Sequence, residues 1–221
     1  MGCLRRLLTG IGCLVVLLAA LAGWLYRDRL GVLYRRIRGV PEPAAPAFVT
    51  PRPDAAREAQ GALDRFAQAA RHGTAGGWVD ISADQLAGLI DRQLEAGPVR
   101  SLDSVAVALD TARVRVRGSL DVTVLPRRVL GPLAGAMSGR QPVVAGGPLV
   151  VTPDGRLWWR IDELKLGDLS LPRATIPVIL KAMSVTDGQG ASVPVPLPTP
   201  VGDVRVTPAG IRLYRPETPA R

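Results

Sequence analysis

The residues with the most reactive side chains are few and scattered along the chain. His72 is the only histidine, and Cys3 and Cys13 are the only cysteines. A structural zinc site needs several His or Cys ligands, so the sequence predicts no metal site and no cofactor. Both cysteines lie near the amino end, so we also expect no disulfide in the rest of the chain. His72 stands at the expected end of a helix, where a cation is favourable.

The stretch 135–139, which reads GAMSG, comes nearest to a nucleophile motif. In the G-x-S-x-G pattern the serine is central, whereas Ser138 stands one place late. A Ser–Lys dyad would need Lys165, expected on the outer face of a strand, or Lys181, expected on the polar side of a helix. We therefore predict a non-enzymatic protein, with a cryptic serine hydrolase at Ser138 as a less favoured alternative.

Two other short motifs suggest chemistry but lack its full pattern. Asp162 and Glu163 could bind a cation or act as paired acids, but consecutive strand residues point to opposite faces of a sheet. The Gly146-Gly147-Pro148 stretch lacks the Lys-Ser or Lys-Thr that follows a phosphate-binding loop. Neither motif predicts a site.

Arginine and valine alternate in residues 112–124, ARVRVRGSLDVTV. Strand periodicity places Ala112, Val114, Val116, Leu120, Val122 and Val124 on one face. Arg113, Arg115 and Arg117 fall on the other face, which continues into Asp121 and Thr123 and so forms no continuous basic groove. We expect the valines to be buried and the arginines to face water, in one strand of about 13 residues.

The net charge of +9 is unevenly distributed, since residues 1–40 hold seven arginines and one acid. The excess therefore lies beside an apolar segment, which is typical of membrane proteins. A nucleic-acid-binding domain would carry the excess on its folded part. We predict membrane lipids and no nucleic acid as partners.

Residues Leu7 to Tyr26 carry no charge and are long enough to cross a bilayer as a helix. The expected membrane residues are Leu14, Val15, Val16, Leu17, Leu18, Trp24 and Tyr26. This pattern predicts a single-pass signal anchor in the cytoplasmic membrane with the domain exported. The alternative is a secreted protein released by signal-peptide cleavage near Ala22. Orientation stays open, because a strict positive-inside count would keep the domain in the cytoplasm.

Three parts follow from these patterns. Residues 1–38 are a signal anchor and basic juxtamembrane segment, 39–53 a Pro-rich linker, and 54–221 an α+β envelope domain. The linker holds five prolines, which exclude a helix and favour an extended tether.

Helical periodicity appears twice at the start of the domain. A first helix begins at Asp54, with Ala59, Leu63, Phe66 and Ala70 on one face. The second begins with Ser82-Ala83-Asp84-Gln85, a capping box in which Ile81 and Leu86 can form a hydrophobic staple. Its apolar stripe consists of Leu86, Leu89, Ile90 and Leu94.

Strand patterns dominate the remainder. Val105, Val107 and Leu109 alternate before a turn at Asp110-Thr111. A hairpin is predicted around Pro153-Asp154-Gly155, with Leu157, Trp159 and Ile161 pointing one way and a bulge near Asp162-Glu163.

The remaining segments complete the domain. We expect a connection over 126–141 with a short helix near 129–137, a helix after Pro172, a Pro-rich loop over 188–200, and a last hairpin around 207–210. The helix after Pro172 directs Ile176, Ile179, Leu180 and Met183 inward. The fold class is α+β: a long-stranded, curved antiparallel sheet packed against helices, with an N-terminal transmembrane helix.

Four segments follow one another in an order that is familiar: ISADQLAGLIDRQL (81–94), VAVALDTARVRVRGSL (105–120), PDGRLWWRIDELKLGDLSLP (153–172) and VGDVRVTPAGIRLY (201–214). In this order the chain resembles bacterial YpmS-like anchored envelope proteins and, less closely, LmeA-like mycobacterial envelope proteins. The resemblance covers about residues 78–214. It implies a relative of tubular lipid-binding folds, in which a curved sheet wraps a long helix, and it brings no functional residues.

The function we expect is a membrane-anchored, non-enzymatic envelope protein that binds lipid or glycolipid in an apolar groove between helix and sheet. The candidate groove residues are Leu86, Leu89, Ile90, Leu94, Val114, Val116, Leu120, Trp159 and Ile161. For each of them core packing is the competing interpretation. A scaffold that binds envelope proteins through its sheet edge or outer face is the alternative function.

Overall fold

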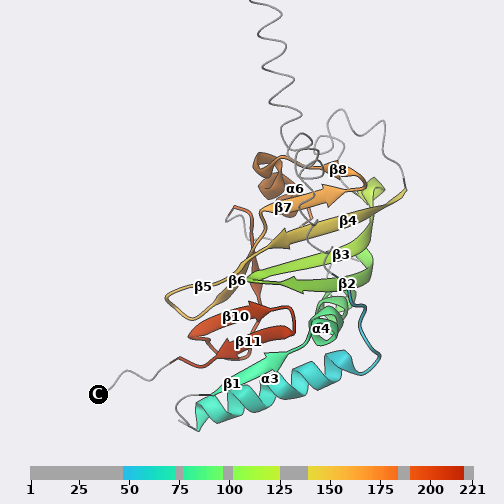
Figure 1. The fold of residues 1–221 in the computed structure, drawn as a ribbon. Coiled ribbons are helices and arrows are strands. Elements are labelled where there is room, and N and C mark those ends of the chain that lie inside the picture. Colours follow the sequence, from blue (N-terminus) through green and yellow to red (C-terminus); the bar gives the residue numbers. More distant parts are fainter. Residues whose placement is uncertain (1–46, 73–76, 97–101, 125–138, 184–189, 217–221) are drawn as a thin grey trace, which may run out of the picture. The chain divides into compact units, whose positions relative to one another are not determined.

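The computed structural model describes residues 47–72, 77–96, 102–124, 139–183 and 190–216. The chain divides into two units, Met1–Ala45 and Pro46–Arg221, and all described residues belong to the second. They form three α-helices and eleven strands, and all the paired strands described run antiparallel. The predicted α+β class is confirmed (Figure 1). The predicted segments 1–38 and 129–137 lie outside the described residues.

Two helices open the domain as predicted. Helix α3 spans Ala55–Arg71, with Asp54 at its N-cap and a buried stripe that includes Ala59, Leu63 and Phe66. Helix α4 spans Ala83–Ala96. Half of the expected capping box forms: the Gln85 side chain accepts a hydrogen bond from the Ser82 N–H at 3.1 Å. The Ser82 hydroxyl instead donates to Asp84, so the second half of the box is missing.

A five-stranded sheet lies beside α4 and α6 (Ile176–Ala182) (Figure 1). Its strands, in spatial order, are β2 (Leu102–Asp110), β3 (Arg113–Asp121), β4 (Arg140–Gly147), β7 (Glu163–Leu166) and β8 (Leu169–Ser170). Register places Val107, Val116, Ala145 and Leu164 in one row. Because Val116 packs with the α4 residues and Leu164 with the α6 residues, both helices cover the same face.

Strand β3 confirms the central prediction for the alternating stretch. Val114, Val116 and Leu120 are 3%, 7% and 2% exposed. Three details differ from expectation. Arg113 and Arg115, expected to face water, are half-buried in ion pairs. Ala112 is exposed, because it occupies the β2–β3 turn with φ +62°. The strand ends at Asp121, and the 3-10 turn η1 (Val122–Val124) replaces its expected last residues.

The remaining strands form two three-stranded sheets rather than an extension of the first. One has the order β1-β11-β10, with β1 at Trp78–Ile81, β10 at Asp203–Thr207 and β11 at Gly210–Tyr214. The other has the order β5-β6-β9, with β5 at Leu149–Val151, β6 at Leu157–Arg160 and β9 at Ser192–Val195. The prediction of a single sheet is therefore wrong, because the described strands form three sheets. Both predicted hairpins form.

The predicted bulge is confirmed by the register of the long two-stranded ribbon in which β4 and β5 pair with β7 and β6. Gly146 pairs with Glu163 and Leu149 with Trp159, so three steps along one strand face four along the other. The extra residue separates β6 from β7 and lets the ribbon pass from one sheet to the next. A Cβ on Gly147 would lie 1.8 Å from the Arg160 carbonyl oxygen, so only glycine fits at this crossing.

Two expected loops contain strands. Arg140 and Gln141, assigned to a connection, begin the central strand β4. The Pro-rich loop predicted over 188–200 includes β9, which pairs with β6. Proline and glycine lower strand propensity in both segments, but pairing with neighbouring strands outweighs it.

Candidate functional site

The outer face of the five-stranded sheet carries the arginines of the alternating stretch. Arg113 binds both oxygens of Asp162, at 3.1 and 2.5 Å. Arg115 lies 3.3 Å from Glu163 and 3.6 Å from Asp110. Lys165 lies 3.3 Å from Glu163. We call Asp110, Arg113, Arg115, Asp162, Glu163 and Lys165 the charge cluster. It holds three cations and three carboxylates, so its charges cancel.

Gly146 makes room for this cluster. Register places it between Arg115 on β3 and Glu163 on β7. A Cβ at Gly146 would lie 3.1 Å from a Glu163 carboxylate oxygen and 3.2 Å from Cγ of Arg115. The missing side chain therefore lets the arginine reach across a whole strand to its acid. The glycines that suggested a phosphate loop instead serve strand packing.

The Asp162 and Glu163 side chains lie on the same face of the sheet, contrary to the expectation that they point to opposite faces. Arg113 contacts both, with Glu163 at 4.0 Å. The reason is that Asp162 precedes β7 and lies in the bulge, where strand alternation does not hold. Hydrogen bonding to Arg113 lowers the pKa of Asp162. Burial raises the pKa of Glu163, but Lys165 and Arg115 outweigh burial and leave that pKa below its usual value.

The segment before α3 is attached to the edge of the same sheet. Val49 exchanges two backbone hydrogen bonds with Val107 on the edge strand β2, at 2.8 and 2.9 Å. The Arg117 guanidinium stacks 4.6 Å from the centre of the Phe48 ring. Arg52 lies 2.6 Å from Asp84 on α4 and 3.1 Å from Glu58 on α3. Residues from Phe48 to Arg52, which belong to the predicted linker, therefore contact the domain.

The candidate groove residues fall into a buried group and a half-buried group. Val114, Val116, Leu120 and Ile161 are buried, and they are divided among three separate core clusters. The half-buried group comprises Leu86, Leu89, Ile90, Leu94 and Trp159, which pack against the largest cluster. The structure thus fills the interior with the buried group and leaves the α4 stripe partly open to solvent.

Trp159 is held in place by its ring nitrogen, which donates a 3.2 Å hydrogen bond to the Gly147 carbonyl. Its indole bridges two core clusters at the point where the ribbon bulges. Ile161, expected to align with Leu157 and Trp159, lies beyond the end of β6 and packs with α6.

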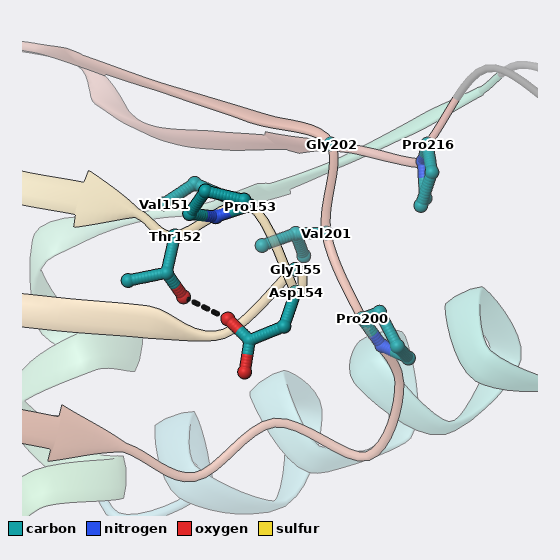
Figure 2. A pocket seen from close by; sticks show the side chains of 9 residues that line it. All are labelled: Val151, Thr152, Pro153, Asp154, Gly155, Pro200, Val201, Gly202 and Pro216. Carbon is teal, nitrogen blue, oxygen red and sulfur yellow. Dashed lines mark hydrogen bonds between the residues drawn. The ribbon is translucent and has the colours of Figure 1, made fainter.

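Two open cavities lie on either side of the β5–β6 hairpin. The first has a volume of about 470 Å³ and is lined by Val151, Thr152, Pro153, Asp154, Gly155, Pro200, Val201, Gly202 and Pro216. Figure 2 shows the Thr152 hydroxyl joined to the Asp154 carboxylate at the turn, beside the segment that carries Pro200 and Val201. The second, of about 460 Å³, is lined by Val150, Thr152, Asp154, Arg156, Trp158, Arg160 and Ser192. Both volumes lie in the range of small-molecule sites, and sequence reasoning pointed to neither.

The other candidate groups occupy ordinary surface positions. His72 is the exposed C-cap residue of α3, as expected. Lys165 is on the outer face of β7 and Lys181 is exposed on α6. Ser138 lies outside the described residues. Within the described ranges, no three His, Cys, Asp or Glu side chains come together in a way that could hold a metal ion.

The membrane residues Leu14, Val15, Val16, Leu17, Leu18, Trp24 and Tyr26 lie outside the described part of the chain, as does the cleavage position near Ala22. Among the residues that the structure does describe, no helix has the length and apolar character needed to cross a bilayer.

Sequence reasoning also missed Trp78 and Tyr214, which lie opposite each other on neighbouring strands β1 and β11. Trp78 is 58% exposed, the largest fraction among the exposed large hydrophobic side chains of the described residues. The alternation of Trp78, Val79, Asp80 and Ile81 is a strand signal that could have revealed this face.

Comparisons with known proteins add no relative. No protein-family model, no curated protein and no solved structure matches the chain.

Proposed function

We propose that this chain is a membrane-tethered, non-enzymatic binding protein of the bacterial cell envelope whose ligand is a lipid or glycolipid. The half-buried stripe of α4 carries the proposal. Leu86, Leu89, Ile90 and Leu94 all remain partly exposed, whereas the equivalent α3 residues Leu63 and Phe66 are buried. An apolar chain lying along this stripe would remove the remaining apolar surface from water.

The sheets would act together as one curved wall in this proposal. The N–H of Ala112, between β2 and β3, donates to the Val206 carbonyl on β10 at 3.1 Å. The ribbon with the bulge connects the five-stranded sheet to the sheet β5-β6-β9. The ligand would lie along α4 at the margin of this wall, since the inner residues Val114, Val116 and Leu120 are already in dense contact.

The ionisable groups support a binding role over catalysis. Each described carboxyl group with a shifted pKa has it lowered, mostly by arginines or hydroxyl groups. A carboxyl group tuned for general acid–base catalysis near neutral pH has a raised pKa instead.

A photoreactive phospholipid analogue incorporated into membranes with the full chain tests the lipid proposal. We expect adducts in residues 83–96, and we expect Leu89→Gln to reduce them. Val178→Gln, at an exposed apolar position on α6, is the matched control and should leave labelling unchanged. Adducts only elsewhere, or equal loss in both variants, would rule out the α4 stripe.

A scaffold for other envelope proteins is the second candidate, and strand β8 favours it, because among the described strands it pairs only with β7. Leu169 on β8 is 37% exposed, and Val178 on the adjacent α6 is 55% exposed. Exposed edges are sites where another strand can pair. Crosslinking in native membranes should give specific protein adducts at this edge if the scaffold role is correct, and none if it is not.

A further inference from the structure

The outer face of the sheet β1-β11-β10 presents aromatic rings alongside charged groups. We call it the aromatic face. Its members, by strand alternation and register, are Trp78, Asp80, Asp203, Arg205, Arg212 and Tyr214. Their neighbours Ile81, Val206, Ile211 and Leu213 point inward and are buried. The core therefore fixes which side chains face outward.

The aromatic face is built from two similar groups. In the first, the Arg212 guanidinium lies 5.3 Å from the centre of the Trp78 ring and binds both oxygens of Asp80, at 2.7 and 3.0 Å. In the second, Arg205 lies 5.1 Å from the Tyr214 ring and 3.5 Å from Asp203. Each group combines one ring, one guanidinium and one carboxylate.

The two rings occupy neighbouring positions on the aromatic face. Trp78 and Tyr214 are directly paired across β1 and β11, and paired side chains on one sheet face are in contact distance. One arginine lies over a face of each ring and restricts its movement, so a stacked ligand would take the other face. Trp78 is 58% exposed and belongs to none of the described core clusters, and such rings are enriched at binding surfaces.

The charges decide which class of ligand fits. The two arginines are each paired with an aspartate, so the face has no net charge. Proteins that stack single-stranded nucleic acid on aromatic rings also need a positively charged groove for the phosphates. A neutral ligand requires no such excess, while the carboxylates and guanidinium groups offer acceptors and donors to hydroxyl groups.

We propose that the aromatic face binds a neutral glycan, with successive sugar rings stacked on Trp78 and Tyr214 and their hydroxyl groups hydrogen-bonded to Asp80 and Asp203. Open sheet faces of other folds bind oligosaccharides in this general way. The site is separate from the α4 stripe, so it does not depend on the lipid proposal.

The test uses the full chain in a detergent without a sugar headgroup, since a sugar headgroup would compete. Chitohexaose, cellohexaose and maltohexaose are titrated in turn by calorimetry. We expect saturable binding of at least one hexasaccharide, and about tenfold weaker binding for Trp78→Ala, the order expected when one stacking ring is removed. Trp78→Phe, which keeps a ring, should recover part of the affinity.

Trp158→Ala is the matched control, because Trp158 lies on the outer face of a different sheet, beside Arg160. It should leave glycan binding unchanged. The proposal is overturned if none of the hexasaccharides binds, or if Trp78→Ala and Trp158→Ala weaken binding equally. It is also overturned if the chain binds poly-dT or anionic phospholipid vesicles in a Trp78-dependent manner, since either result would assign the face to a charged ligand.

Discussion

The charge cluster and the aromatic face both place arginines on the outer side of a sheet, yet they differ in what surrounds those arginines. Beside Arg115 the neighbouring positions are Ala108 and Gly146, and these small residues let the side chain lie flat and reach an acid two strands away. Beside Arg212 and Arg205 stand rings that project outward. Small neighbours bury an arginine as part of the structure, whereas aromatic neighbours leave a surface that a ligand can use.

Removing Arg113 should have the largest effect on stability. Its side chain and that of Asp162 are only 31% and 28% exposed, so Arg113→Met leaves the partly covered Asp162 carboxylate without its cation, whereas Glu163 keeps Arg115 and Lys165. We expect a loss of about 1–3 kcal/mol, measured by urea unfolding. The double variant R113M/D162N should recover part of it; a single variant as stable as the parent would contradict a structural role for the cluster.

Filling the gap at Gly146 should cost somewhat less. Gly146→Ala places a methyl group against Cγ of Arg115 and a carboxylate oxygen of Glu163, and these flexible side chains can shift by a few tenths of an ångström. We expect a loss of about 1 kcal/mol in the free energy of unfolding. Gly61→Ala is the control: it lies in α3, where only the Arg65 guanidinium is near, and it should stabilise the protein by about 0.5–1 kcal/mol. Equal effects of both substitutions would show that the gap is irrelevant.

Acid should remove the contribution of the charge cluster to stability. The pKa values of Asp162 and Glu163 are lower in the folded chain than in the unfolded chain. Their contribution to stability is therefore complete above about pH 5 and declines as the pH falls through about 4 and below. When the experiment is run at about pH 6 and again at about pH 3, we expect the urea midpoint of D162N to fall less than that of the parent. Parallel curves would contradict the ion pairing.

Changes on the aromatic face should have the smallest effect on stability. Trp78→Ala should alter the free energy of unfolding by about 0.5 kcal/mol or less, because the ring is mostly exposed. Arg212→Met should leave the melting temperature unchanged, since exposed ion pairs contribute little. A large loss in either variant would mean that this face is structural and that the contrast with the charge cluster is false.

Local patterns predicted the elements whose partners are close in sequence. The 207–210 hairpin, the α4 start at Ser82 and the β3 alternation follow from neighbouring residues. Strand β4 was missed because Pro142, Gly146 and Gly147 weaken the strand signal. Those glycines are required by contacts with Arg160 and Glu163, which lie far along the chain.

The candidate site was predictable only in part for the same reason. Burial of Val114, Val116 and Leu120 follows from a period of two. The pairing of Arg113 with Asp162 depends on the order β3-β4-β7 and on a bulge that places Asp162 on the outer face. Trp78 meets Tyr214 only because β1 pairs with β11, near the other end of the domain. Pairing over such separations leaves no signal in a single local window.

Hydroxyl-radical footprinting of the full chain, first in detergent and then on isolated cell envelopes, tests the central contrast most directly. We expect Trp78 and Tyr214 to become protected on envelopes and digestion of envelope glycans to restore their labelling, while Trp158 is labelled equally throughout. Unchanged labelling of Trp78 on envelopes, or protection that survives glycan digestion, would contradict the contrast.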